Sequence, residues 1–292
     1  MPTQPGIELI AYEYLNGDSV LPRGGIECAV VDAEPTTELR DLLSTLPSLR
    51  LLLALSAGTE KWEKILPPGV DLANARGAHS LAVVEWVLAV VLNHLRDLRH
   101  YQEQQRHGTW SPRVSDSIQG RRVVVAGGGA IGLAIERTLK TLGADVKVLG
   151  GSSRNPLTSG FIASEVRLCK VLIVSLPHNA STVDLINEQV FSALENDALV
   201  VNVGRGSAIT TPALLHWLEV SRGWAFLDVI QPEPLPAHHP LWQHPRAFVS
   251  PHVAGMTQGR DRRAWEILQS DIVRFFAGEK LENLVTRRPS AW

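Results

Sequence analysis

A glycine-rich turn joins an apolar segment to an amphipathic one near the middle of the chain. Residues 123–126 are apolar and mostly valine, and residues 133–142 carry apolar side chains at helical spacing. The turn between them reads G-x-G-x-x-G and consists of Gly127, Gly128, Gly129, Ala130, Ile131 and Gly132. Gly127 permits a tight turn, Gly129 permits close approach of a pyrophosphate, and Gly132 permits close packing of helix on strand. The pattern predicts a dinucleotide-binding α/β domain whose helix N-terminus faces the phosphates.

The segment after the next strand bears on which dinucleotide binds. The strand is expected over residues 144–149, and NAD-binding domains usually carry there an acidic residue that binds the ribose 2′-hydroxyl. Here the chain has Ser152, Ser153 and Arg154 instead, with no carboxylate. A guanidinium and two hydroxyls suit a 2′-phosphate, which favours NADP(H) and leaves NAD(H) possible. The alternative is that Arg154 is an ordinary solvated loop residue.

Composition narrows the class of protein. The 292 residues suffice for two domains, and 45% hydrophobic with 20% charged residues is typical of a globular protein. A net charge of −2 gives no basic field for nucleic acid, and we expect no signal peptide. The longest apolar run, 81–92, is too short for a bilayer and contains Glu85, so we expect no membrane partner. Cys28 and Cys169 adjoin apolar runs, which favours core packing and a cytoplasmic location.

The N-terminal part alternates expected strands and helices. Strands are predicted over 7–12, 27–32 and 51–56, and a helix over 36–45. Such alternation implies a parallel sheet that binds ligands at the carboxyl ends of its strands. Ala57 and Gly58 follow one such end, where backbone N–H groups can hold a small anion; the alternative is a plain strand-to-helix turn. One long buried helix over 79–100 and a connecting loop over 102–120 are expected next.

Three charged side chains follow successive strands of the dinucleotide domain. The later strands are predicted over 171–175, 198–202, 224–228 and 247–250, with a closing helix over 265–276. Arg205, Glu233 and His252 come after the last three strands. Because the carboxyl ends of parallel strands share one edge, these side chains are expected together at the cofactor's edge.

Each of the three side chains, taken alone, has an ordinary structural interpretation. Arg205 would be a surface cation, Glu233 a charge in a loop, and His252 a structural histidine with its hydrogen bonds made. Together beside a nicotinamide they fit carbonyl reduction. Arg205 can hold a carboxylate and the neighbouring carbonyl oxygen, and protonated His252 can donate its proton to that oxygen. Glu233 bonded to His252 would raise the pKa of the imidazole. No metal is required, because the two cations polarise the carbonyl.

Several motifs in order carry a family resemblance. They are the glycine turn at 127–132, the segments 200–206 and 227–236, the His-Pro-Leu-Trp sequence at 239–242, and the segment 250–255. On these motifs the chain resembles the D-isomer-specific 2-hydroxyacid dehydrogenase family over nearly its whole length. The segment 234–242 is most similar to glyoxylate/hydroxypyruvate reductases.

The resemblance implies a fold and a set of site residues. It implies a Rossmann doubly wound parallel sheet, over 89–255, inserted in a smaller flavodoxin-like α/β substrate domain formed by 1–88 and 256–292. It implies Arg205, Glu233 and His252 as catalytic residues and a homodimeric assembly. It also implies further contacts: Ala57 and Gly58 at the substrate carboxylate, Leu176, Pro177 and Thr182 near the adenosine, and Val203 and Asp228 beside the nicotinamide.

The predicted function is reduction of small 2-keto acids, such as glyoxylate or hydroxypyruvate, to D-2-hydroxy acids with NADPH. One alternative is an NAD-dependent dehydrogenase of another D-2-hydroxy acid. The other is a non-catalytic dinucleotide-sensing scaffold of the same fold, since such scaffolds keep the same three residues.

Overall fold

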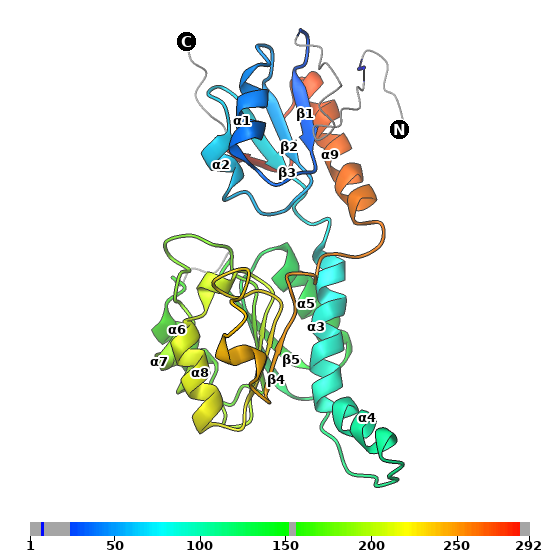
Figure 1. The fold of residues 1–292 in the computed structure, drawn as a ribbon, viewed down its shortest axis with the longest axis vertical. Helices are drawn as coiled ribbons and strands as arrows, with labels where there is room; N and C mark the ends of the chain where they lie inside the picture. The colour runs from blue at the N-terminus through cyan, green and yellow to red at the C-terminus, as the bar shows by residue number, and fades with distance from the viewer. Residues whose placement is uncertain (1–6, 9–23, 152–155, 287–292) are drawn as a thin grey trace. The chain divides into compact units, whose positions relative to one another are not determined.

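The chain forms two compact units in a computed structural model that describes residues 7–8, 24–151 and 156–286 (Figure 1). One unit comprises Met1–Ala75 with Ala264–Trp292, and the other comprises Arg76–Arg263. The family resemblance predicts these two boundaries at 88/89 and 255/256, whereas the structure has them at 75/76 and 263/264. The shift at the first boundary has a packing reason, because the helix that follows it buries Val83, Val87 and Val91 in the core of the second unit.

The first unit is built on a four-stranded sheet in the order β1-β2-β3-β10. Its elements are β1 (Cys28–Val31), α1 (Thr37–Ser44), β2 (Leu51–Ala54), α2 (Trp62–Ile65), β3 (Asp71–Asn74), the C-terminal part of α9 (Arg260–Phe276) and β10 (Leu284–Thr286). The first three strands are parallel, and β10 joins β3 in the antiparallel direction. The strand expected over 7–12 falls mostly outside the described residues.

The second unit contains a six-stranded parallel sheet in the order β5-β4-β6-β7-β8-β9. Its strands are β4 (Arg122–Ala126), β5 (Asp145–Leu149), β6 (Val171–Val174), β7 (Leu199–Asn202), β8 (Trp224–Leu227) and β9 (Ala247–Val249). Its helices are α3 (Ser80–Leu95), α4 (Leu98–Arg106), α5 (Ala130–Thr141), α6 (Ser159–Glu165), α7 (Glu188–Phe191), α8 (Thr211–Val220) and the short 3-10 turns η2 (Gly206–Ala208) and η3 (Pro240–Trp242). Strand β5 lies on one side of β4, and the next strand in the chain, β6, lies on the other side. The direction in which successive strands are added therefore reverses at β4.

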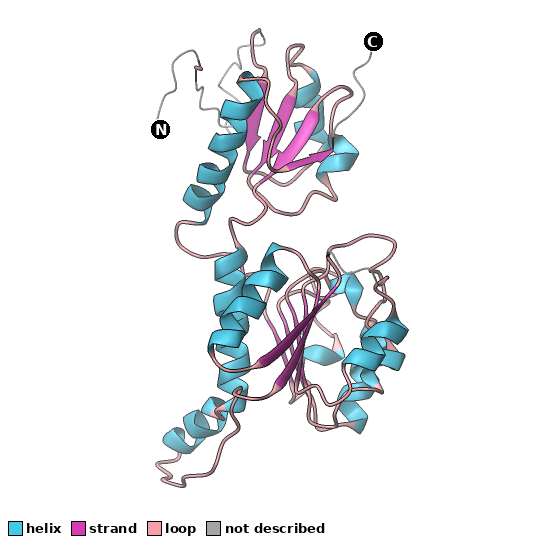
Figure 2. Ribbon diagram, turned by 180° about the vertical axis from the view of Figure 1, so that it is seen from behind, coloured by secondary structure: helices cyan, strands magenta, loops and turns pink. Residues whose placement is uncertain are grey.

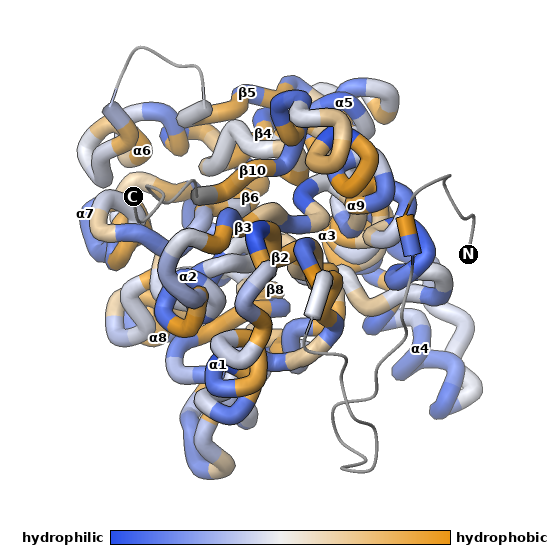
Figure 3. Tube along the Cα trace, turned by 90° about the horizontal axis from the view of Figure 1, so that it is seen from above, coloured by the Kyte–Doolittle hydropathy of each residue, from blue (hydrophilic) through white to orange (hydrophobic). Residues whose placement is uncertain are grey.

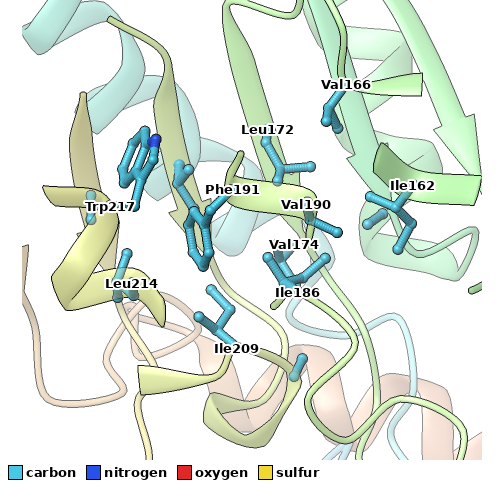
Figure 4. Close-up of a cluster of buried hydrophobic side chains, with 14 of the residues drawn as sticks. Ile162, Val166, Leu172, Val174, Ile186, Val190, Phe191, Ile209, Leu214 and Trp217 are labelled. Carbon is cyan, nitrogen blue, oxygen red and sulfur yellow. The ribbon is translucent and has the colours of Figure 1, made fainter. Parts of the chain in front are cut away.

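Alternating residues of the central strands build a core on each face of this sheet. Val123 and Val125 of β4 pack with α3 and α5, whereas Val124 packs on the opposite face with α6, α7 and α8. The two helical layers are visible in Figure 2, and Figure 4 shows the second cluster, with Phe191 beside Trp217. The predicted α/β class with an inserted Rossmann domain is confirmed.

The prediction of one helix over 79–100 is wrong. The helix ends at Leu95, and Asp97 adopts a left-handed backbone with φ 54° before α4 begins. The carboxylate of Asp97 pairs with Arg113 at 2.8 Å, which stabilises the break. The helix α4 also occupies the first residues of the loop expected over 102–120. It has no buried residue and is mostly hydrophilic in Figure 3, so no apolar face marks it as a helix.

Candidate active site

The glycine turn has the shape that a pyrophosphate requires. Gly127 has φ 126°, and a Cβ on it would lie 2.6 Å from the carbonyl oxygen of Ser175. A Cβ on Gly132 would lie 1.8 Å from the carbonyl oxygen of Gly127, so the helix approaches the turn closely. Gly129 differs: it begins α5 without a side-chain cap, and a Cβ there would meet open space. An uncapped helix N-terminus with open space beside it is the arrangement that binds a dinucleotide phosphate.

The remaining residues expected near the cofactor are partly described. Ala130 is exposed and Ile131 half-buried in the first turn of α5. Leu176 is buried, and the following residue is held because Thr182 donates its hydroxyl to the carbonyl oxygen of Pro177 at 2.6 Å. Thr182 thus shapes the turn after β6. Ser152, Ser153 and Arg154 lie outside the described residues, so their contact with a 2′-phosphate stays a prediction.

Arg205 follows β7 in a tight turn. Val203, before it, is 6% exposed, and the Arg205 guanidinium donates from Nη1 to the carbonyl oxygen of Gly204 at 3.0 Å. A Cβ on Gly206 would lie 2.0 Å from the carbonyl carbon of Ile230, which follows β8. The turn that carries Arg205 therefore lies directly against the segment that leads to Glu233.

Glu233 and His252 form a hydrogen-bonded ion pair. The Oε2 atom of Glu233 accepts from His252 Nδ1 at 3.0 Å, and its Oε1 atom accepts from the backbone N–H of Ile230 at 3.1 Å. The hydrogen bond to Glu233 raises the pKa of His252 above its ordinary value, although partial burial and Arg205 oppose this. Burial acts to raise the pKa of Glu233, but the bonds from His252 and Ile230 outweigh it and lower that pKa. The pair thus favours imidazolium and carboxylate.

The loop of His252 is held from beneath by Asp228. His252 has a left-handed backbone with φ 57° and donates its N–H to the carbonyl oxygen of Asp228 at 2.9 Å. The Asp228 carboxylate, 3% exposed, accepts three more bonds, from Ser250 Oγ at 2.6 Å and from the N–H groups of Val253 and Ala254 at 2.9 Å each. The structure therefore gives Asp228 a role under the loop, beside its predicted contact with the nicotinamide.

The structure brings Arg205, Glu233 and His252 together at the carboxyl ends of adjacent strands, as their mutual effects on pKa also indicate. Ala57 and Gly58 belong to the other unit, where they follow β2. Their turn is ordered by Ser56 Oγ, which donates to the Gly58 carbonyl at 2.9 Å, and by Asn74 Nδ2, which donates to the Ala57 carbonyl at 2.6 Å. Over the described ranges, no three His, Cys, Asp or Glu side chains group as a metal site.

This arrangement can orient an anion and deliver a proton. A guanidinium can hold a carboxylate by two parallel bonds, and an imidazolium fixed at Nδ1 by a carboxylate presents Nε2–H to a substrate. Sequence reasoning did not single out the Ile230 N–H, Ser250 or the buried Asn202. The Ile230 N–H gave no signal because every residue type except proline supplies this group. Ser250 and Asn202 gave none because each bonds a residue that follows another strand, Asp228 and Val229 respectively.

Comparisons with known proteins find one matching family and several similar proteins. The model of the family "D-isomer specific 2-hydroxyacid dehydrogenase, NAD binding domain" matches residues 88–254. The glyoxylate/hydroxypyruvate reductase A of Yersinia enterocolitica is 30% identical over 236 residues, which cover 75% of this chain and 74% of the relative.

Two solved structures are similar over most of their length. The NADPH-dependent glyoxylate/hydroxypyruvate reductase of Sinorhizobium meliloti, in complex with NADP and sulfate, gives a TM-score of 0.78 at 26% identity and covers 90% of this chain and 85% of that one. The D-isomer specific 2-hydroxyacid dehydrogenase of Xanthobacter autotrophicus Py2, in complex with NADPH and MES, gives a TM-score of 0.82 at 27% identity. The match covers 97% of this chain and 91% of that one.

Proposed function

This chain belongs to the D-isomer specific 2-hydroxyacid dehydrogenase family and is an NAD(P)-dependent oxidoreductase, and we propose that it reduces small 2-oxo acids with NADPH. Glyoxylate and hydroxypyruvate are the proposed substrates and D-2-hydroxy acids the products. The observation that carries the proposal is the Glu233–His252 pair beside Arg205, which supplies a proton donor and an anion clamp at one sheet edge. The names of the Yersinia and Sinorhizobium relatives support the substrate class.

In the proposed reaction each side chain has one task. Arg205 binds the substrate carboxylate and the 2-oxo oxygen through its parallel N–H groups. The hydride comes from the reduced dinucleotide when it is bound at the glycine turn. His252 transfers its Nε2 proton to the oxygen as the carbonyl carbon is reduced, and Glu233 holds the Nδ1–H so that the imidazole keeps its orientation. The N–H groups of the Ala57–Gly58 turn are proposed to bind the carboxylate.

A rate panel tests this function. Initial rates with glyoxylate, hydroxypyruvate and pyruvate, each with NADPH and NADH, are expected to be highest for the first two acids with NADPH. Arg205→Ala should lose about 2–4 kcal/mol of transition-state stabilisation, because a charged two-point contact is removed. His252→Gln should abolish reduction while NADPH still binds. Absence of turnover with every 2-oxo acid in the wild-type protein favours the dinucleotide-sensing scaffold and refutes the proposal.

The preference for NADPH is proposed from Ser152, Ser153 and Arg154, and the nucleotides in the Sinorhizobium and Xanthobacter structures support it. Arg154→Ala should weaken NADPH binding and leave NADH binding nearly unchanged, as measured by quenching of tryptophan fluorescence. Equal losses for the two nucleotides would refute the 2′-phosphate contact.

We further propose a homodimer located in the cytoplasm. Trp110 and Val114, in the loop after α4, are 96% and 99% exposed, and Figure 1 shows α4 extending away from the sheet of its unit. The loop is nevertheless held in place, because the Tyr101 hydroxyl donates to the Arg113 carbonyl at 3.0 Å. An ordered, exposed tryptophan fits a surface that a second copy covers. Light scattering should report a dimer that Trp110→Ser weakens and the control Leu168→Ser, 75% exposed elsewhere, does not.

A further inference from the structure

Asn202 is a polar side chain enclosed in the core at the carboxyl end of β7. It is 1% exposed, and the residues before it in the strand are fully buried apolar side chains. A buried primary amide is unfavourable unless its donors and acceptor are paired, so its bonds indicate what it holds.

The amide of Asn202 joins three backbone groups in two loops. Its Oδ1 atom accepts from the Gly204 N–H at 3.1 Å. Its Nδ2 atom donates to the carbonyl oxygen of Arg205 at 3.2 Å and to that of Val229 at 3.4 Å. The Arg205 turn and the segment after β8, which leads to Glu233, are therefore linked through one side chain.

Backbone from two other segments lies close against the Arg205 turn, at Gly204 and at Gly206. A Cβ on Gly204 would lie 2.5 Å from the backbone nitrogen and oxygen of Leu176, and a Cβ on Gly206 would lie 2.0 Å from the carbonyl carbon of Ile230. The next contact reaches the ion pair, since the Ile230 N–H donates to Glu233 Oε1. The Arg205 turn therefore has a glycine at each of its two close backbone contacts, and the Asn202 amide bonds its backbone from the core side.

We propose that Asn202 is a positioning residue that sets where the Arg205 guanidinium lies relative to the Glu233–His252 pair. The inference rests on the proposed function, in which Arg205 binds the substrate carboxylate. Without the amide, the Arg205 and Val229 carbonyls lose a donor, and the turn relaxes away from the segment after β8. A displacement of ~1 Å at a substrate-orienting group lowers the rate on the order of 100-fold.

A double-mutant cycle tests whether Asn202 acts through Arg205. Asn202→Ala is made in the wild-type chain and in Arg205→Ala, and reduction of glyoxylate is measured as single turnovers with enzyme in excess over NADPH. We expect a loss on the order of 100-fold in the first background. In the second background we expect a change within about twofold, since the group being positioned is gone. Equal losses in both backgrounds, or no loss in the first, overturn the inference.

A matched control separates positioning from general destabilisation. Val200→Ala removes methyl groups from a fully buried position of the same strand without touching the turn. It should lower the melting temperature and leave the turnover rate unchanged, whereas Asn202→Ala should lower both. Rates are compared below the melting temperature of the least stable variant.

Amide hydrogen exchange gives a readout that does not depend on activity. Exchange of the segment 203–209 should accelerate in Asn202→Ala and in Asn202→Asp, which keeps the acceptor but replaces the donor, and stay unchanged in Val200→Ala. Unchanged exchange in both Asn202 variants overturns the inference. If the wild-type protein reduces no 2-oxo acid, the proposed function fails, and this measurement alone decides whether Asn202 holds the turn.

Discussion

Replacing Asp228 by asparagine tests how the loop of His252 is held. The carboxylate accepts on Oδ1 from Ser250 Oγ and the Val253 N–H, and on Oδ2 from the Ala254 N–H. An asparagine can keep its oxygen toward the first two donors only by turning its NH2 group toward Ala254. Two donors then face each other at a site where the side chain is 3% exposed.

The expected loss follows from these contacts. A hydrogen bond to a charged group contributes about 1.5–3 kcal/mol, and a buried donor left without an acceptor costs about 1–3 kcal/mol. These two effects overlap at the Ala254 N–H, so Asp228→Asn should lower the free energy of unfolding by about 2–4 kcal/mol. The control Ser250→Ala removes one neutral donor and leaves both N–H bonds, and should lower it by only about 1 kcal/mol.

Urea unfolding followed by circular dichroism measures both variants against the wild-type protein. Equal losses for Asp228→Asn and Ser250→Ala would refute the reasoning, because the bond from the Ala254 N–H would then contribute no more than the neutral bond from Ser250. A variant with wild-type stability but weakened binding of NADPH would instead assign the Asp228 carboxylate to the nicotinamide. Loss of stability with activity impaired in proportion to the unfolded fraction would leave Asp228 a purely structural residue.

Three further perturbations have expected outcomes. Glu233→Gln removes the partner that raises the pKa of His252, so the decline of kcat/KM for reduction at high pH should move to lower pH; an unmoved pH–rate profile contradicts the proton-donor role. Gly206→Ala should destabilise the fold by about 1–3 kcal/mol in urea unfolding because its Cβ has no room, whereas Gly129→Ala should keep stability and weaken NADPH binding. Burial, aided by the nearby Lys170, lowers the pKa of His94, so the His94 imidazole takes up a proton more readily in the unfolded chain than in the folded one. The free energy of unfolding should therefore fall as the pH drops through 6.5. His94→Gln should flatten that fall, as measured by urea unfolding at a series of pH values.

The second unit was largely predictable from its sequence. Its central strands β4, β6 and β7 are short, largely buried and rich in β-branched residues, and several strands end where glycine or a charged residue follows. The positions of Arg205, Glu233 and His252 after successive strands predict that they lie at one edge of the sheet, and the structure has them there. What a pattern does not encode is a contact between segments that follow different strands, such as the bond from Ser250 Oγ to Asp228.

The helix break at Asp97, the helix α4 and the role of Asn202 were not predicted from the sequence, each for a physical reason. The break at Asp97 carries no glycine or proline, and its left-handed backbone is favoured by a pairing with Arg113 on a later segment. The helix α4 is strongly hydrophilic and has only two apolar residues, Leu98 and Tyr101, which are too few to identify a surface helix from its apolar positions. Asn202 resembles the polar start of a loop, because only the folded sheet places the Val229 carbonyl beside it.

The C-terminal strand has a consequence for how the polypeptide matures on the ribosome. Leu284 of β10 lies opposite Ala73 of β3, and Asp271 holds the approach to this strand by accepting the N–H groups of Glu282 and Asn283. The inserted unit is contiguous and can close while translation continues, but the edge of the N-terminal sheet at β3 stays open until residues 284–286 have been synthesised. A nascent chain stalled before Leu284 should therefore expose β3 to proteases and to edge-to-edge aggregation.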